Sequence, residues 1–176
     1  GIEAVAQAID LKGKDGYVLS FNGGKIIRYA SEEVVYANEL SAELGQRIMA
    51  FAKEYEIPIL TYDDQYVVTE FPEDEHIRYE GMLNHMELKK VENISEYVTY
   101  ATPKYLMVAP EERLLPVMDK MIPAFPECNL FRSEAFFLEV MPKGIDKKLS
   151  LKRLLEYLDC KPEEMIAFGD GFNDIP

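Results

Sequence analysis

Near its end, the chain has side chains that could bind a metal ion. Asp170, Asn173 and Asp174 lie in Gly169-Asp170-Gly171-Phe172-Asn173-Asp174, where two glycines allow a sharp turn and the close approach of a ligand. Two carboxylates and an amide supply the hard oxygen ligands that Mg²⁺ prefers. The same residue types also favour turns and helix N-termini. The segment therefore predicts either a magnesium site or a polar turn.

A second candidate is a lysine at the start of a predicted helix. Lys147 follows the loop Pro142-Lys143-Gly144 and directly precedes leucines at helical spacing. A cation near a helix N-terminus opposes the helix dipole, which is mildly unfavourable unless an anion lies nearby. A phosphoryl group together with Asp170 and Asp174 would supply negative charge there. The alternative is a solvated surface lysine.

Apolar patterns predict the elements that position these residues. Residues 136–141 and 165–168 are expected to be strands, and the leucines between 149 and 158 recur on one helical face. The continuously apolar run 165–168 is typical of a strand buried on both faces. Strand, helix and strand in this order form half of a doubly wound α/β sheet, in which ligands bind at the carboxyl ends of the strands. We therefore expect Lys147 and Asp170 at one rim of a parallel sheet.

The rest of the chain predicts a mixture of helices and strands. A helix begins at Ser41 and ends before Pro58, another lies around 111–121, and two short helices lie within 76–98. Asn22-Gly23-Gly24 has residues that tolerate positive φ in tight turns. The expected strands are 17–21, 25–29, 57–62, 66–69, 104–109 and 128–132, the last of which is expected to pair with the strand at 136–141.

Two motifs in this order resemble a known family. FFLEVMPKGIDKK, a leucine-rich helix and CKPEEMIAFGDGFNDI are similar to the third and fourth motifs of Cof-type sugar phosphatases in the haloacid dehalogenase (HAD) superfamily. Residues 17–24 resemble the family's strand and NG turn. The resemblance implies an α/β fold: a partial Rossmann-like HAD core with a parallel sheet, residues 1–29 and 133–176, and an inserted α/β cap domain, residues 30–132.

The resemblance also implies a role for each site residue. Lys147 would be catalytic, contacting the phosphoryl group and screening its charge. Asp170 and Asp174 would bind the implied cofactor, Mg²⁺. Asn173 would bind the substrate phosphate, and Asn22 would border the same site. The implied activity is hydrolysis of phosphate monoesters of small metabolites, sugar phosphates first, through an aspartyl-phosphate.

The family's nucleophile motif, DxDGT, does not occur in the 176 residues. Asp10-Leu11-Lys12-Gly13 lacks the second acid, and Asp63-Asp64 falls in a predicted turn. The chain thus resembles a fragment that begins after the family's first two motifs and lacks the C-terminal part of the core. We expect this fragment alone to be inactive as a phosphatase.

Two other functions are compatible with parts of the pattern. One is a non-catalytic module that binds a small molecule or a partner, which a core lacking its nucleophile could become. The other is a phosphoacceptor domain like that of response regulators, which also places carboxylates and a lysine around Mg²⁺. A cap-sized insert, and a lysine that precedes rather than follows the acidic loop, argue against the phosphoacceptor.

The composition argues against two classes of binding partner, nucleic acids and membranes. The formal net charge of −13 argues against nucleic acid, whose binding depends on clustered Lys and Arg. The sequence contains no run of about eighteen apolar residues, so it predicts no transmembrane helix. Its first residues do not resemble a signal peptide. We expect a cytoplasmic protein that binds a small phosphorylated metabolite, with no nucleic-acid or membrane partner. The sequence indicates no oligomeric state.

Overall fold

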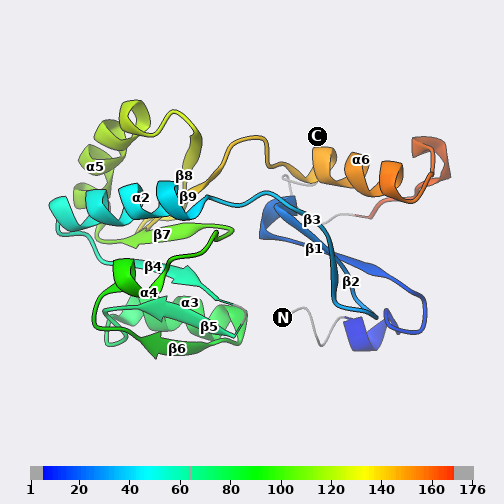
Figure 1. The fold of residues 1–176 in the computed structure, drawn as a ribbon, viewed down its shortest axis with the longest axis horizontal. Helices are drawn as coiled ribbons and strands as arrows, with labels where there is room; N and C mark the ends of the chain where they lie inside the picture. The colour runs from blue at the N-terminus through cyan, green and yellow to red at the C-terminus, as the bar shows by residue number, and fades with distance from the viewer. Residues whose placement is uncertain (1–5, 64, 169–176) are drawn as a thin grey trace. The chain divides into compact units, whose positions relative to one another are not determined.

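The computed structural model describes residues 6–63 and 65–168, which belong to two compact units (Figure 1). Residues 39–143 make up one unit, here called the continuous unit. The described residues 6–38 and 144–168 belong to the other, here called the split unit because two separate stretches of chain build it. The continuous unit is therefore an insertion between the two parts of the split unit.

A six-stranded sheet forms the centre of the continuous unit, in the order β6-β5-β4-β7-β9-β8. Its neighbouring strands are antiparallel, except β5 and β6, which run parallel. The strands are β4 (Ile59–Tyr62), β5 (Tyr66–Thr69), β6 (Glu87–Lys90), β7 (Tyr105–Val108), β8 (Cys128–Glu134) and β9 (Phe137–Pro142). The predicted α/β fold class is confirmed, with a sheet that contains parallel pairing.

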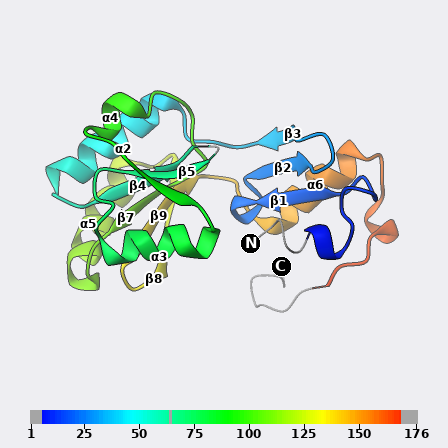
Figure 2. The ribbon, with the colours of Figure 1, turned by 90° about the horizontal axis from the view of Figure 1, so that it is seen from below.

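Helices lie on both sides of this sheet. α2 (Ala42–Glu54), α4 (Ile94–Tyr97) and α5 (Glu111–Ala124) share one apolar core with the sheet. α3 (Glu75–Asn84) lies on the opposite side from α2 and α4 (Figure 2). Because both faces are covered, every residue of β4, β7 and β9 is buried. These strands therefore do not alternate between apolar and polar residues, as strands of a sheet with one solvent-exposed face do.

The start of α2 follows from its sequence. Ser41 caps the helix, as predicted, because its hydroxyl accepts a hydrogen bond from the Leu44 amide at 3.2 Å. Gly45 then allows a close approach to β7, since a Cβ at this position would lie 2.3 Å from the Tyr105 hydroxyl oxygen. The cap and the glycine together fix where α2 lies on the sheet.

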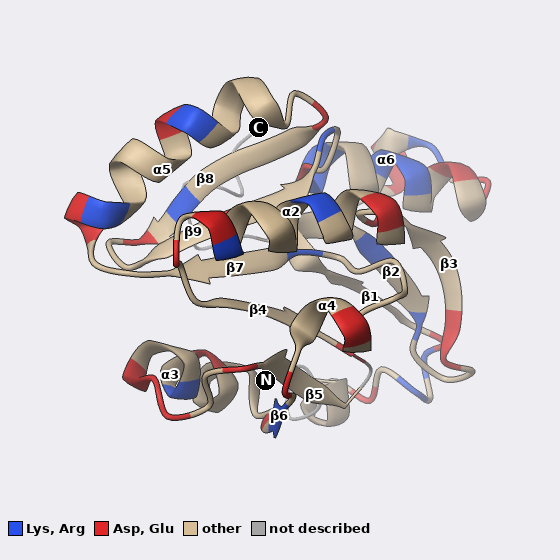
Figure 3. Ribbon diagram, turned by 60° about the vertical axis from the view of Figure 1, so that its left-hand side comes forward, with Lys and Arg blue, Asp and Glu red and all other residues tan. Residues whose placement is uncertain are grey.

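The outer surfaces of the helices are polar. Acidic and basic residues are interspersed along α2 and α5 (Figure 3), which is typical of solvated helix faces. Among the described helices, none combines the length and the apolar character that crossing a lipid bilayer requires.

The split unit contains a small antiparallel sheet and one long helix. β1 (Tyr17–Ser20), β2 (Lys25–Arg28) and β3 (Glu33–Ala37) pair in chain order, and the short helix η1 (Phe21–Gly23) joins the first two. α6 (Lys147–Tyr157) packs against this sheet: the rings of Tyr17 and Tyr157 are 6.1 Å apart, and the Arg153 guanidinium lies 4.3 Å from the Tyr36 ring centroid. η2 (Pro162–Glu164) follows.

The predicted strand at 165–168 is wrong for the described residues. This run adopts no regular secondary structure, and Ile166 and Phe168 are 83% and 95% exposed. A four-residue apolar run becomes a strand only where neighbouring strands accept and donate its backbone hydrogen bonds. Among the described residues, no strand pairs with it.

The predicted strand at 136–141 exists as β9, and its predicted pairing with the strand at 128–132, which is β8, is confirmed, but β9 lies in a different sheet from the one expected. β9 pairs antiparallel with β7 and β8, so it belongs to the sheet of the continuous unit and not to a parallel core. β3 and β6, which were not predicted, extend the two sheets. The units consequently divide at 38/39 and 143/144, whereas the sequence placed the divisions at 29/30 and 132/133.

Gly45→Ala should destabilise the continuous unit by about 2 kcal/mol, because its Cβ would overlap the Tyr105 hydroxyl. Urea unfolding monitored by circular dichroism measures the change. Tyr105→Phe removes the overlapping oxygen, so the double variant should regain part of the lost stability. A double variant as unstable as the sum of its single changes would contradict this packing.

Candidate functional site

The turn that carries Asn22 has the backbone conformation that its sequence predicted. Asn22 has φ 54° and ψ 25°, and Gly23 has φ 94°, both in the left-handed region. Gly23 is buried, while Asn22 is exposed. The turn therefore holds its glycine inward and leaves the asparagine accessible to a ligand.

Lys147 is the first residue of α6, as expected. Asp146 caps the helix, and its carboxylate accepts a hydrogen bond from the Leu149 amide at 2.6 Å. Asp146 is exposed and Lys147 is half-buried. The lysine is thus held at the helix end where unpaired amides and the helix dipole favour an anion.

The Asn22 turn and the first turn of α6 are in direct contact. The Ser150 hydroxyl, which is fully buried, donates a hydrogen bond to the Gly23 carbonyl oxygen at 2.6 Å. A Cβ on Gly23 would lie only 2.2 Å from the Ser150 hydroxyl oxygen. Two predicted site residues, Asn22 and Lys147, therefore come from segments that the structure brings together.

The predicted metal ligands lie outside the described residues. Asp170, Asn173 and Asp174 belong to the segment after residue 168, so their place relative to Lys147 stays a prediction. Within residues 6–63 and 65–168, no group of three or more His, Cys, Asp or Glu side chains could hold a metal ion.

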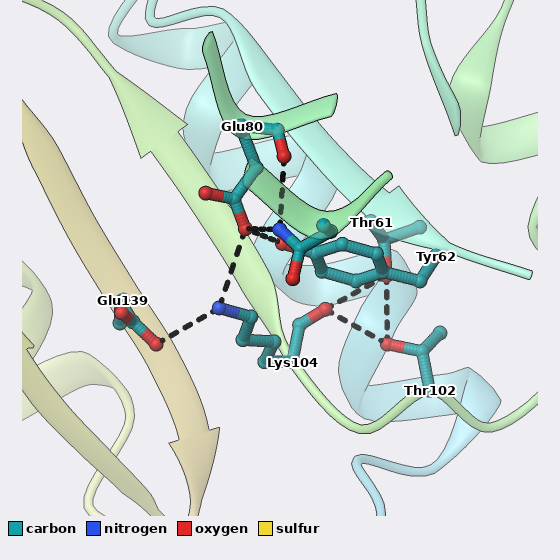
Figure 4. A network of polar contacts seen from close by, with 7 residues as sticks. Thr61, Tyr62, Glu80, Thr102, Lys104 and Glu139 are labelled. Atoms are coloured by element: carbon teal, nitrogen blue, oxygen red, sulfur yellow. Dashed lines mark hydrogen bonds and ion pairs between the residues drawn. The ribbon is translucent and has the colours of Figure 1, made fainter. Parts of the chain in front are cut away.

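The continuous unit contains a polar network that the sequence did not predict (Figure 4). The Lys104 ammonium lies 3.3 Å from the Glu139 carboxylate and 3.7 Å from that of Glu80. Asn84 donates to Glu80 at 2.8 Å, and the Tyr62 hydroxyl also donates to Glu80. The side chains of Glu80 and Glu139 are only 8% and 9% exposed, so one lysine partners two nearly buried acids.

The network also changes the acidity of Tyr62. Burial, and then the nearby charge and hydrogen bond of Glu80, raise the pKa of Tyr62 well above its usual 10.0. The phenol therefore keeps its proton at neutral pH and continues to donate to Glu80. Only Glu139 could have indicated this network from the sequence, because it is a lone acid among the apolar residues of β9.

Comparison with known proteins identifies the family. The family model described as haloacid dehalogenase-like hydrolase matches residues 1–176. The chain belongs to this family. The HAD resemblance predicted from the two motifs is therefore confirmed.

Individual HAD relatives agree with this assignment. A haloacid dehalogenase-like hydrolase from Bacteroides thetaiotaomicron has a crystal structure similar to this chain, with a TM-score of 0.93 and 37% identity, covering 99% of this chain and 66% of that one. A Serratia proteamaculans protein named HMP-PP phosphatase is 25% identical, over 92% of this chain and 59% of its own length.

A HAD subclass IIB sugar phosphatase shares the fold, with a TM-score of 0.70 and 22% identity, over 95% of this chain and 63% of that one. The chain thus spans 59–66% of the length of these three relatives. The Cof-type resemblance is supported at the level of the fold.

Lys104→Met should destabilise the continuous unit by about 3 kcal/mol, because it leaves two nearly buried carboxylates without their cation. Denaturant unfolding at neutral pH measures the loss. Lys53→Met, which removes an exposed lysine of α2, is the matched control and should change stability little. Equal effects of the two substitutions would show that the network does not stabilise the fold.

Proposed function

We propose that the protein to which this chain belongs hydrolyses phosphate monoesters of small metabolites with the help of Mg²⁺, sugar phosphates being the first candidates. The observation that carries the proposal is Lys147 at the N-terminus of α6, next to the Asn22 turn. Membership of the HAD hydrolase family supports a hydrolase. The relative named HMP-PP phosphatase supports phosphate release, and the sugar phosphatase that shares the fold supports the substrate class.

The roles of the two units follow from the family. In this proposal the split unit is part of the HAD core, and the continuous unit is the inserted cap domain. A cap that closes over a site excludes water and selects the leaving group. The substrate is therefore chosen by side chains of the continuous unit.

Charge neutralisation is the chemistry that this chain's own residues could supply. Transfer of a phosphoryl group develops negative charge on its oxygens, and a fixed ammonium lowers the energy of that state. Lys147 would contact these oxygens, while the amides of Asn22 and Asn173 would orient the phosphate. The nucleophilic aspartate that the family resemblance implies is not among the 176 residues.

The residues after 168 have suitable chemistry for a magnesium ion. Asp170 and Asp174 offer carboxylate oxygens, which Mg²⁺ prefers, and leave room for water and phosphate oxygens in its coordination shell. When bound, the ion would supply further positive charge beside the phosphate. In this proposal Lys147 and the two aspartates serve the same phosphate from different segments.

Lys147→Ala should lower kcat by about a hundredfold or more, because it removes a charge that stabilises the transition state. Steady-state assays with a panel of sugar phosphates at saturating Mg²⁺, on the protein in its natural length, measure the loss. Lys148→Ala removes the neighbouring, exposed lysine and should leave kcat nearly unchanged. Normal activity of Lys147→Ala would refute its role, whereas no phosphate release by the unmodified protein would favour a non-catalytic binding module.

Asp170→Asn should raise the Mg²⁺ concentration for half-maximal activity by about tenfold or more, because the metal loses a charged ligand. Titration of activity with Mg²⁺ tests this. Asp159→Asn is a suitable control, since Asp159 is exposed and asparagine tolerates its left-handed backbone. An unchanged Mg²⁺ dependence for Asp170→Asn would remove this residue from the metal site.

A further inference from the structure

Ser150 is a buried hydroxyl with two acceptors within reach. Its side chain has no exposed surface, and its oxygen lies 2.6 Å from the Gly23 carbonyl oxygen and 3.0 Å from that of Asp146. Helical serines commonly bond the carbonyl four residues earlier, which here is Asp146. The shorter distance is to Gly23, so the single proton of the hydroxyl joins α6 to a different segment of the chain.

The fit between Gly23 and α6 leaves no space for a larger residue. A Cβ on Gly23 would lie 2.2 Å from the Ser150 oxygen and 3.1 Å from the Asp146 carbonyl oxygen. Gly23 also has φ 94°, which L-residues rarely adopt. The turn thus lies too close to the helix for a side chain at position 23, and the Ser150 hydrogen bond joins the two at this point.

The same contact lies beside both described site residues. Asn22 directly precedes Gly23, and Lys147 lies one helical turn before Ser150. A shift of the turn along α6 would change the distance between the Asn22 amide and the Lys147 ammonium. Catalytic groups that must act on one phosphate lose much of their effect when one of them moves by about 1 Å.

We propose that Ser150 is a positioning residue, which fixes the Asn22 turn relative to Lys147 through its hydrogen bond to the Gly23 carbonyl. This inference rests on the proposed function, because it assumes that Lys147 and Asn22 serve the same phosphate. Ser150 itself touches no substrate. Its contribution is the constant separation of two groups that come from distant parts of the sequence.

Ser150→Ala should lower kcat/KM for a sugar phosphate about tenfold in the natural-length protein at saturating Mg²⁺. Ser150→Cys keeps only a weak donor, and its larger sulfur would displace the Gly23 carbonyl 2.6 Å away, so it too should lower kcat/KM. Ile26→Val, a cavity change at another fully buried residue of the split unit, is the matched control for lost stability. At a temperature where all variants are folded, it should retain normal kcat/KM.

A double-mutant cycle with Asn22→Ala separates positioning from a merely structural role. If Ser150 acts through the Asn22 turn, Ser150→Ala should cost much less in the Asn22→Ala background than in the unmodified protein. An equal cost in both backgrounds, or an equal loss in Ile26→Val, would overturn the inference. Normal activity of both Ser150 variants would do so as well.

The two proposals fail in different ways. If the unmodified natural-length protein releases no phosphate from the panel, the proposed function fails, and Ser150 has no catalytic group to position. If Lys147→Ala is impaired while Ser150→Ala is normal, only the positioning role is lost.

Discussion

Lys147 occupies the end of α6 at which a positive charge is least favourable on its own. The first amides of the helix lack carbonyl partners within the helix, and the dipole adds positive potential there. Asp146 compensates in part, since its carboxylate binds the Leu149 amide. An anion placed beside Lys147 would be attracted by the ammonium and by the helix end together. The proposed phosphate site depends on this concentration of positive potential.

The contact between Gly23 and Ser150 brings a second segment of the chain, the turn that carries Asn22, to the proposed phosphate site. Asn22 arrives from the turn between β1 and β2, and more than a hundred residues of the continuous unit separate it from α6 in the sequence. Because the chain leaves the split unit and returns, no local interaction could set the two segments side by side. Instead, the two segments are joined by the buried hydrogen bond from Ser150 to Gly23, and the missing side chain of Gly23 allows their close approach.

Local patterns predicted the helices and most strands because their causes are local. Ser41 caps α2, and the leucines after Lys147 give α6 its period, so neighbouring residues alone specify both elements. The predictions that failed were those that depend on which strands pair with one another. The apolar run 165–168 has no strand beside it among the described residues, and β9, although it pairs with β8 as predicted, belongs through β7 to the sheet of the continuous unit.

The site shows the same division between local and distant causes. Lys147 and Asn22 could be selected from short motifs, whereas Ser150 looked like one more residue of the helix. The partnership of Lys104 with Glu80 and Glu139 joins residues from separate elements, and only the fold reveals it. Its charges link Glu80 of α3 to Glu139 of β9 through Lys104, which directly precedes β7.

A crystal structure of the protein in its natural length, with Mn²⁺ in place of Mg²⁺ and with inorganic phosphate, tests the central claim most directly. The account predicts the Lys147 Nζ atom within about 3 Å of a phosphate oxygen. It also predicts anomalous density for the metal about 2 Å from carboxylate oxygens of Asp170 or Asp174. A phosphate and metal bound together elsewhere, with Lys147 directed away from both, would contradict it.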